Sequence, residues 1–100
     1  MDNARKFYIN GAWVEPSTTD ILDVINPATE RPIASIAMGG TADVDAAVAA
    51  AKAAFESFSQ STVEERIALL DKITELMGAR SGEFANTISS EMGAPGGLAK

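Results

Sequence analysis

The feature that most constrains the fold of this 100-residue chain is a single change of hydrophobic period at Thr41. Before it, β-branched and aromatic residues form short runs broken by Asn, Gly and Pro, a pattern typical of β-strands. After it, apolar residues recur at helical spacing. One passage from strand to helix cannot complete a parallel sheet, which needs a crossover between successive strands. The sequence therefore predicts an α+β chain in which short strands come first and three helices follow.

Strands are expected between about residues 6 and 38. In "KFYINGAWV", Asn10 and Gly11 tolerate the positive φ angles of a two-residue turn, so the sequence predicts a hairpin of residues 7–9 with 12–14. Further along, "ILDVI" and "PIASIAM" flank "NPATERP", whose prolines exclude a helix and favour a turn. This pattern indicates a second hairpin or a pair of edge strands.

Helices are predicted over residues 42–58, 62–79 and 82–92. Two overlapping capping boxes precede the second helix, Ser61 with Glu64 and Thr62 with Glu65. Gly93 suits the left-handed position after the third helix. Each predicted helix has an apolar stripe. The stripe of the first helix is formed by Val44, Ala47, Val48, Ala51, Phe55 and Phe58, and that of the second by Val63, Ile67, Leu70, Ile73 and Met77. The stripe of the third helix is formed by Phe84, Ile88 and Met92.

The stripes of the first two helices can pack on each other, on a partner chain, or on the rest of a larger polypeptide. Packing within the chain is the simplest interpretation. The final stretch "EMGAPGGLAK" has no polar tail or clear cap, so we expect the polypeptide to continue beyond it.

Composition excludes several classes of function. The chain has 14 acidic and 8 basic residues, with a net charge of −6, which disfavours binding to nucleic acid or to an anionic membrane. It lacks Cys and His, and so lacks a thiolate nucleophile, a cysteine metal site and the commonest general base. "MDNARKFYIN" has no apolar run after its basic pair, and no run reaches the roughly 18 apolar residues of a membrane span. We expect a cytoplasmic protein.

Three candidate sites can be weighed from the residues. In "AMGGTADVD", Gly39 and Gly40 precede a helix as in phosphate sites, but Asp43 and Asp45 would repel an anion, so a turn that needs glycine dihedral angles is favoured. The carboxylate pairs Glu64/Glu65 and Asp71/Glu75 are interpreted as solvated. A serine nucleophile has no recognisable base. We therefore expect no catalytic residue in this chain.

Four segments in order are "YINGAWV", "DVINPATERPIASIAMGGTADVDAAVAAAKAAF", "ERIALLDKITELM" and "SSEMGAP". Together they resemble the amino-terminal portion of the NAD(P)-dependent aldehyde dehydrogenase superfamily, over residues 7–95. The resemblance implies a larger α/β Rossmann-like enzyme, in which residues 1–100 are the N-terminal part of the cofactor-binding domain. The catalytic domain lies outside this chain.

The resemblance also implies an activity. Members oxidise aldehydes to carboxylic acids with NAD or NADP, through a cysteine thioester that a glutamate-activated water hydrolyses, while an asparagine amide steadies the oxyanion. It implies no catalytic and no cofactor-binding residue among residues 1–100, and a homo-oligomer, commonly a dimer or tetramer. The choice of aldehyde, of NAD or NADP, and of water or coenzyme A as acyl acceptor stays open.

Site residues follow from the same resemblance. Phe55, Leu70, Ile73 and Phe84 are implied to be packing residues. A monovalent cation, Na⁺ or K⁺, is implied between the Ile25 carbonyl and the Glu91 carboxylate, where the family commonly has Asp. A solvated glutamate at the end of a helix is the alternative for Glu91.

A second hypothesis from another class is a stand-alone, acidic, helical interaction module that uses its apolar helix faces to bind a partner. Such a module is expected to end in a helix cap and a polar tail.

Overall fold

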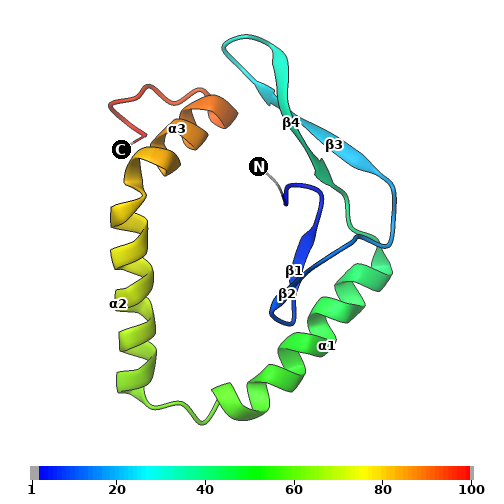
Figure 1. Ribbon diagram of the computed structural model, residues 1–100, viewed down its shortest axis with the longest axis vertical. Helices are drawn as coiled ribbons and strands as arrows, with labels where there is room; N and C mark the ends of the chain where they lie inside the picture. The colour runs from blue at the N-terminus through cyan, green and yellow to red at the C-terminus, as the bar shows by residue number, and fades with distance from the viewer. Residues whose placement is uncertain (1–2, 100) are drawn as a thin grey trace. The chain divides into compact units, whose positions relative to one another are not determined.

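The computed structural model describes residues 3–99, which form two separate compact units. The first contains residues 3–25 and 32–59, and the second contains residues 26–31 and 60–99. The expected order of two small hairpins followed by three helices is confirmed (Figure 1).

The first unit begins with the hairpin of β1 (Phe7–Ile9) and β2 (Ala12–Val14), in the register that pairs Tyr8 with Trp13. Asn10 and Gly11 have φ angles of 54° and 77°, so the turn has the positive φ pair that Asn-Gly favours. The Tyr8 and Trp13 rings meet edge to face with centroids 5.2 Å apart. This cross-strand aromatic pair stabilises the hairpin beyond its two-residue turn.

The second hairpin consists of β3 (Ile21–Asn26) and β4 (Arg31–Ala37). Its turn is organised by Asn26, whose side-chain oxygen accepts from the Ala28 amide at 2.9 Å and whose carbonyl accepts from the Glu30 amide at 2.8 Å. Glu30 has a φ angle of 58°, in the left-handed region.

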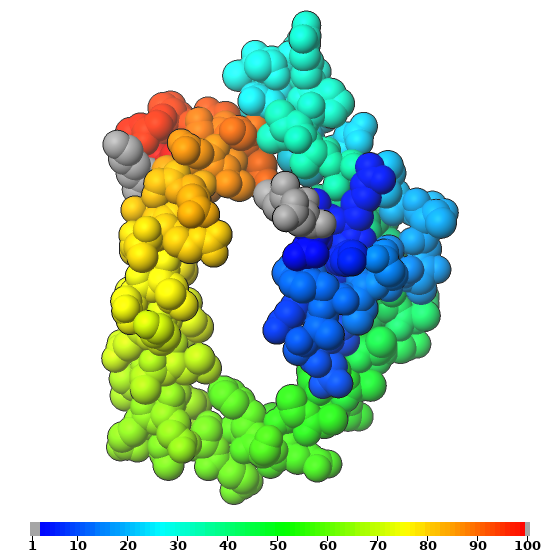
Figure 2. Space-filling model, in the orientation of Figure 1, coloured from blue at the N-terminus to red at the C-terminus, as the bar shows by residue number. Residues whose placement is uncertain are grey.

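Helix α1 (Thr41–Phe58) completes the first unit and lies beside the β1–β2 hairpin. In Figure 2 the atoms of this hairpin (blue) lie against those of α1 (green). The expectation that Gly39 and Gly40 need glycine dihedral angles is wrong, because neither has a positive φ. Gly40 is needed for space, because a Cβ there would lie 2.9 Å from the Thr18 Cγ2 atom. A Cβ on Gly39 would make an ordinary contact with the Phe7 ring at 3.4 Å.

The second unit contains α2 (Val63–Ala79) and α3 (Ser81–Met92), which Figure 1 shows set at an angle to each other. Of the two predicted capping boxes, the structure forms the second. The Thr62 hydroxyl accepts from the Glu65 amide at 3.1 Å, and the Glu65 carboxylate accepts from the Thr62 amide at 2.7 Å. Gly93 ends α3 with a φ angle of 76°, as its position predicts.

The described residues bury very little. Among residues 3–99 only Ala37 and Ala85 are buried, and α1 and α2 contain no buried residue. Because α1 and α2 lie in different units, packing of their apolar stripes within this chain, the simplest interpretation, stays a prediction. The implied packing residues Phe55, Leu70, Ile73 and Phe84 are 67%, 62%, 45% and 42% exposed.

Candidate functional site

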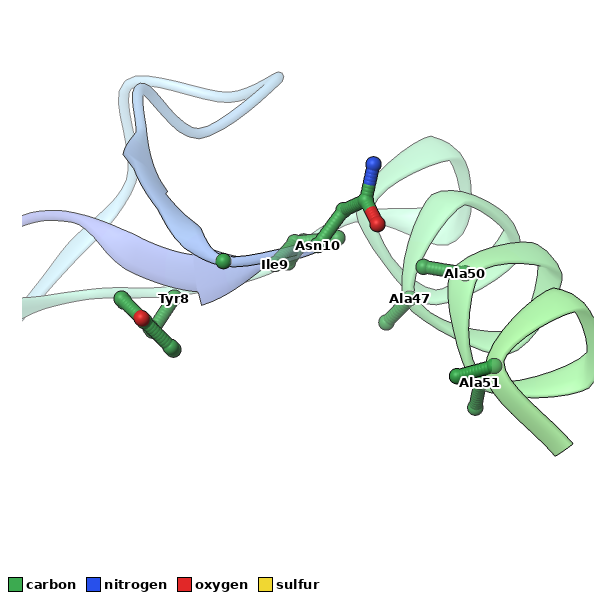
Figure 3. Close-up of a pocket in the computed structure, with 8 residues that line it drawn as sticks. Tyr8, Ile9, Asn10, Ala47, Ala50 and Ala51 are labelled. Carbon is green, nitrogen blue, oxygen red and sulfur yellow. The ribbon is translucent and has the colours of Figure 1, made fainter. Parts of the chain in front are cut away.

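The first unit has a groove of about 350 Å³ between the β1–β2 hairpin and α1, which we call the hairpin–helix groove. Figure 3 shows its two walls, with Tyr8, Ile9 and Asn10 from the hairpin and Ala47, Ala50 and Ala51 from the helix. The alanine side chains are short, so space remains between the surface of α1 and the hairpin.

The chemistry of the hairpin–helix groove is apolar. Its polar side-chain groups are the Tyr8 hydroxyl and the Asn10 amide, and its lining contains no carboxylate, amine or thiol. A site of this composition can cover apolar surface, but it has no nucleophile paired with a base and no set of metal ligands. The lining of the groove is suited to packing against apolar surface.

A second arrangement lies at the start of α1, where the Asp43 carboxylate accepts three hydrogen bonds. Its donors are the Ser17 amide at 2.9 Å, the Ser17 hydroxyl at 2.6 Å and the Gly40 amide at 2.8 Å. The hydrogen bond from the Ser17 hydroxyl is the largest cause that holds the pKa of Asp43 below its usual value, and the hydrogen bond from the Gly40 amide is the next. Both carboxylate oxygens are engaged, so Asp43 ties the chain after β2 to the start of α1.

These hydrogen bonds also bear on the glycine pair. The Gly40 amide, which a bound phosphate would need, already donates to Asp43. The structure therefore favours a structural role for Gly39 and Gly40 over phosphate binding. Sequence reasoning missed the part played by Ser17, which lies 26 positions from Asp43. The spacing of Gly40 and Asp43 is the one local signal, because a carboxylate at the third helical position can reach back to the residue before the helix.

The other carboxylates are engaged in local structure or exposed. Glu65 caps α2, and Glu75 pairs with Lys72 at 2.9 Å. Glu83 pairs with Arg80 at 2.8 Å, and that partner lowers the pKa of Glu83. Among residues 3–99 no group of three or more acidic side chains is placed to hold a metal ion.

The structure places the two predicted cation ligands in different units. Ile25 lies in β3 of the first unit, and Glu91 is an exposed residue of α3 in the second. The structure does not test this pairing, and it stays a prediction. No helix within residues 3–99 combines the length and the apolar character that crossing a bilayer requires.

Comparison with known proteins decides the family. The sequence model of the aldehyde dehydrogenase family matches residues 13–100. The chain belongs to the aldehyde dehydrogenase family. It is 46% identical over 95% of its length to a putative aldehyde dehydrogenase of Staphylococcus aureus, of which it covers 20%. The part of the family that it represents is the amino-terminal segment.

Solved aldehyde dehydrogenases have the same local fold. A Bartonella henselae aldehyde dehydrogenase matches 95% of the chain with a TM-score of 0.93 and 48% identity, over 20% of its own length. A variant of aldehyde dehydrogenase C from Pseudomonas syringae, in complex with NAD⁺ and octanal, matches 98% of the chain with a TM-score of 0.96 and 46% identity, again over 20% of its length. The chain thus spans about a fifth of the relatives it matches.

Proposed function

We propose that this chain is the amino-terminal segment of an enzyme that oxidises an aldehyde to a carboxylic acid with NAD⁺ or NADP⁺, through a cysteine thioester. The observation that carries the proposal is the family match over residues 13–100, together with 46–48% identity to aldehyde dehydrogenases. Support for NAD⁺ comes from the Pseudomonas syringae relative, which was solved with NAD⁺.

The role proposed for residues 1–100 is structural. They contain no Cys, and the described residues form neither a phosphate cradle nor a nucleophile with its base. When bound, the nicotinamide supplies a hydride acceptor, and we propose that parts of the polypeptide outside this chain hold it. Instead, the hairpin–helix groove and the apolar stripes of α1 and α2 offer surface that the rest of the polypeptide would cover.

The test is an assay of the full-length protein with a straight-chain and an aromatic aldehyde, following reduction of NAD⁺ and of NADP⁺ by absorbance. We expect aldehyde-dependent reduction that a thiol-alkylating reagent abolishes, and no turnover by residues 1–100 alone. The absence of turnover with a broad panel of aldehydes and both cofactors would contradict the proposal. Addition of coenzyme A distinguishes an acylating enzyme from a hydrolytic one.

We also propose the monovalent cation site at the Ile25 carbonyl and the Glu91 carboxylate. Support comes from the donor set, since carbonyl and carboxylate oxygens are the ligands that hard cations prefer. Thermal unfolding of the full-length protein in NaCl, KCl and tetramethylammonium chloride at equal ionic strength tests it. We expect Na⁺ or K⁺ to raise the Tm, and Glu91→Gln to remove that rise. Asp71→Asn, which removes an exposed carboxylate from α2, should leave it unchanged. A cation response that survives Glu91→Gln would refute the assignment.

The alternative, a stand-alone interaction module, is favoured by one observation, the exposure of large apolar side chains along α1 and α2. The two proposals differ in what covers those side chains, either the rest of the same polypeptide or a separate partner. The mass of the native polypeptide separates them.

A further inference from the structure

A close approach within the second unit joins Pro27, in the turn between β3 and β4, to Gly93, at the C-terminal end of α3. A Cβ atom placed on Gly93 would lie 2.9 Å from the Pro27 Cγ atom and 3.8 Å from its Cβ atom. Real Cβ atoms do not approach a carbon so closely, so only glycine fits while Pro27 keeps its place. Because the proline ring is closed onto its own backbone nitrogen, it has no rotamer that swings Cγ away, and full relief would require the backbone of the turn to move.

The turn itself is internally fixed. Two hydrogen bonds to Asn26, from the amides of Ala28 and Glu30, hold residues 26–31 in one conformation. These residues belong to the second unit together with α3, whereas most of each flanking strand belongs to the first.

We propose that Pro27 and Gly93 form a steric lock that makes the β3–β4 turn and the C-terminal end of α3 one rigid element, so that the turn follows the helix. Gly93 is then required twice, once for its φ angle of 76° and once for the space that Pro27 occupies. The lock concerns only the packing of residues 27 and 93. The proposal does not depend on which reaction the full-length protein catalyses.

Hydrogen exchange of the full-length protein, followed by mass spectrometry, tests the lock from both sides. We expect Pro27→Ala to speed exchange in residues 89–95 about tenfold, although none of those residues is changed. Gly93→Ala should speed exchange in residues 26–31 by a similar factor. In the double variant the two effects should not multiply, since either substitution alone already breaks the same contact.

Two control variants separate the lock from general effects. Gly11 has nearly the same φ as Gly93, 77°, but has nothing within 4 Å of the position of its Cβ. Gly11→Ala should therefore leave exchange in residues 26–31 unchanged. Pro32→Ala removes a neighbouring proline and should leave residues 89–95 unchanged.

The lock is refuted if Pro27→Ala leaves residues 89–95 exchanging at the wild-type rate, or if the effects of Pro27→Ala and Gly93→Ala multiply in the double variant. If Gly93→Ala prevents folding, exchange in residues 89–95 of Pro27→Ala is compared with that of Pro32→Ala, and this comparison is enough to test the lock.

Discussion

Asp43 organises more of the local structure than its place in an acidic first turn suggests. Three donors hold its carboxylate, and its pKa lies below the ordinary value of 3.8. A lowered pKa in the folded state means that the stabilisation is fully present above the unfolded-state pKa and is lost as the pH falls through the folded-state pKa. The contribution of Asp43 to stability should therefore disappear only in acid.

We predict that Asp43→Asn lowers the Tm of the full-length protein at neutral pH and flattens its decline between about pH 5 and about pH 2. The measurement is thermal unfolding across that range. Asp45→Asn is the matched control, because it removes a carboxylate from the same turn but none of the three hydrogen bonds to Asp43. Identical pH profiles for the two variants would contradict the account.

Gly40 offers a second prediction, because its surroundings leave no room for a side chain. A Cβ there would meet Thr18 Cγ2 at 2.9 Å, and Thr18 cannot rotate away without losing the 2.7 Å hydrogen bond from its hydroxyl to the Met38 carbonyl. We expect Gly40→Ala to cost about 1 kcal/mol of unfolding free energy, the value of one such hydrogen bond. Urea unfolding measures it.

A compensating variant and a control make this prediction specific. Thr18→Ser keeps the hydroxyl and removes Cγ2, so it should restore most of the stability lost in Gly40→Ala. Gly78 lies in α2 with open space around it, and Gly78→Ala should stabilise by up to about 1 kcal/mol through helix propensity. A Gly40→Ala variant as stable as wild type would show that the Thr18 side chain is free to move.

At the scale of the element, the start of α2 is a local structure that the sequence predicts well. The reciprocal hydrogen bonds of Thr62 and Glu65 satisfy two amides of the first turn. We expect Thr62→Ala to cost about 1 kcal/mol and to lower the helix content of a synthetic peptide of residues 60–80, measured by circular dichroism. Thr74→Ala, in the middle of the same helix, should leave the content unchanged or raise it. Equal losses from both substitutions would argue against the cap.

Elements whose ends are encoded locally are those that the sequence predicts correctly. Asn10-Gly11 specifies its own turn, and Gly93 with Pro95 ends α3. Contacts between distant residues could not be predicted, such as Ser17 with Asp43 or Pro27 with Gly93. Hydrophobic period shows which face of a helix is apolar but not what covers it, and for this reason the expected packing within the chain stays a prediction.

At the scale of the whole molecule, the account rests on the apolar surface that residues 3–99 leave uncovered. Leu70 on α2 is 62% exposed in this chain. If the rest of the polypeptide covers Leu70, Leu70→Ala should lower the unfolding free energy of the full-length protein by about 2–5 kcal/mol, as in a packed core. If Leu70 stays at the surface, the change should be within about 0.5 kcal/mol. Chemical denaturation of the full-length variant measures the difference. A small cost would favour the interaction module.

The family and the α+β order of elements could both be predicted from the sequence, since they depend on ordered local motifs. The cytoplasmic location, the homo-oligomer and the cation at Ile25 and Glu91 stay predictions. They depend on surroundings or on parts of the polypeptide that these residues do not contain.

The most direct test of the central claim is the intact mass of the native polypeptide, measured by mass spectrometry of protein purified from its source. The account predicts a mass about five times 10.4 kDa, because the chain spans 20% of its curated relatives. A native mass of 10.4 kDa would contradict it and would identify a self-contained small protein whose apolar helix faces bind a partner.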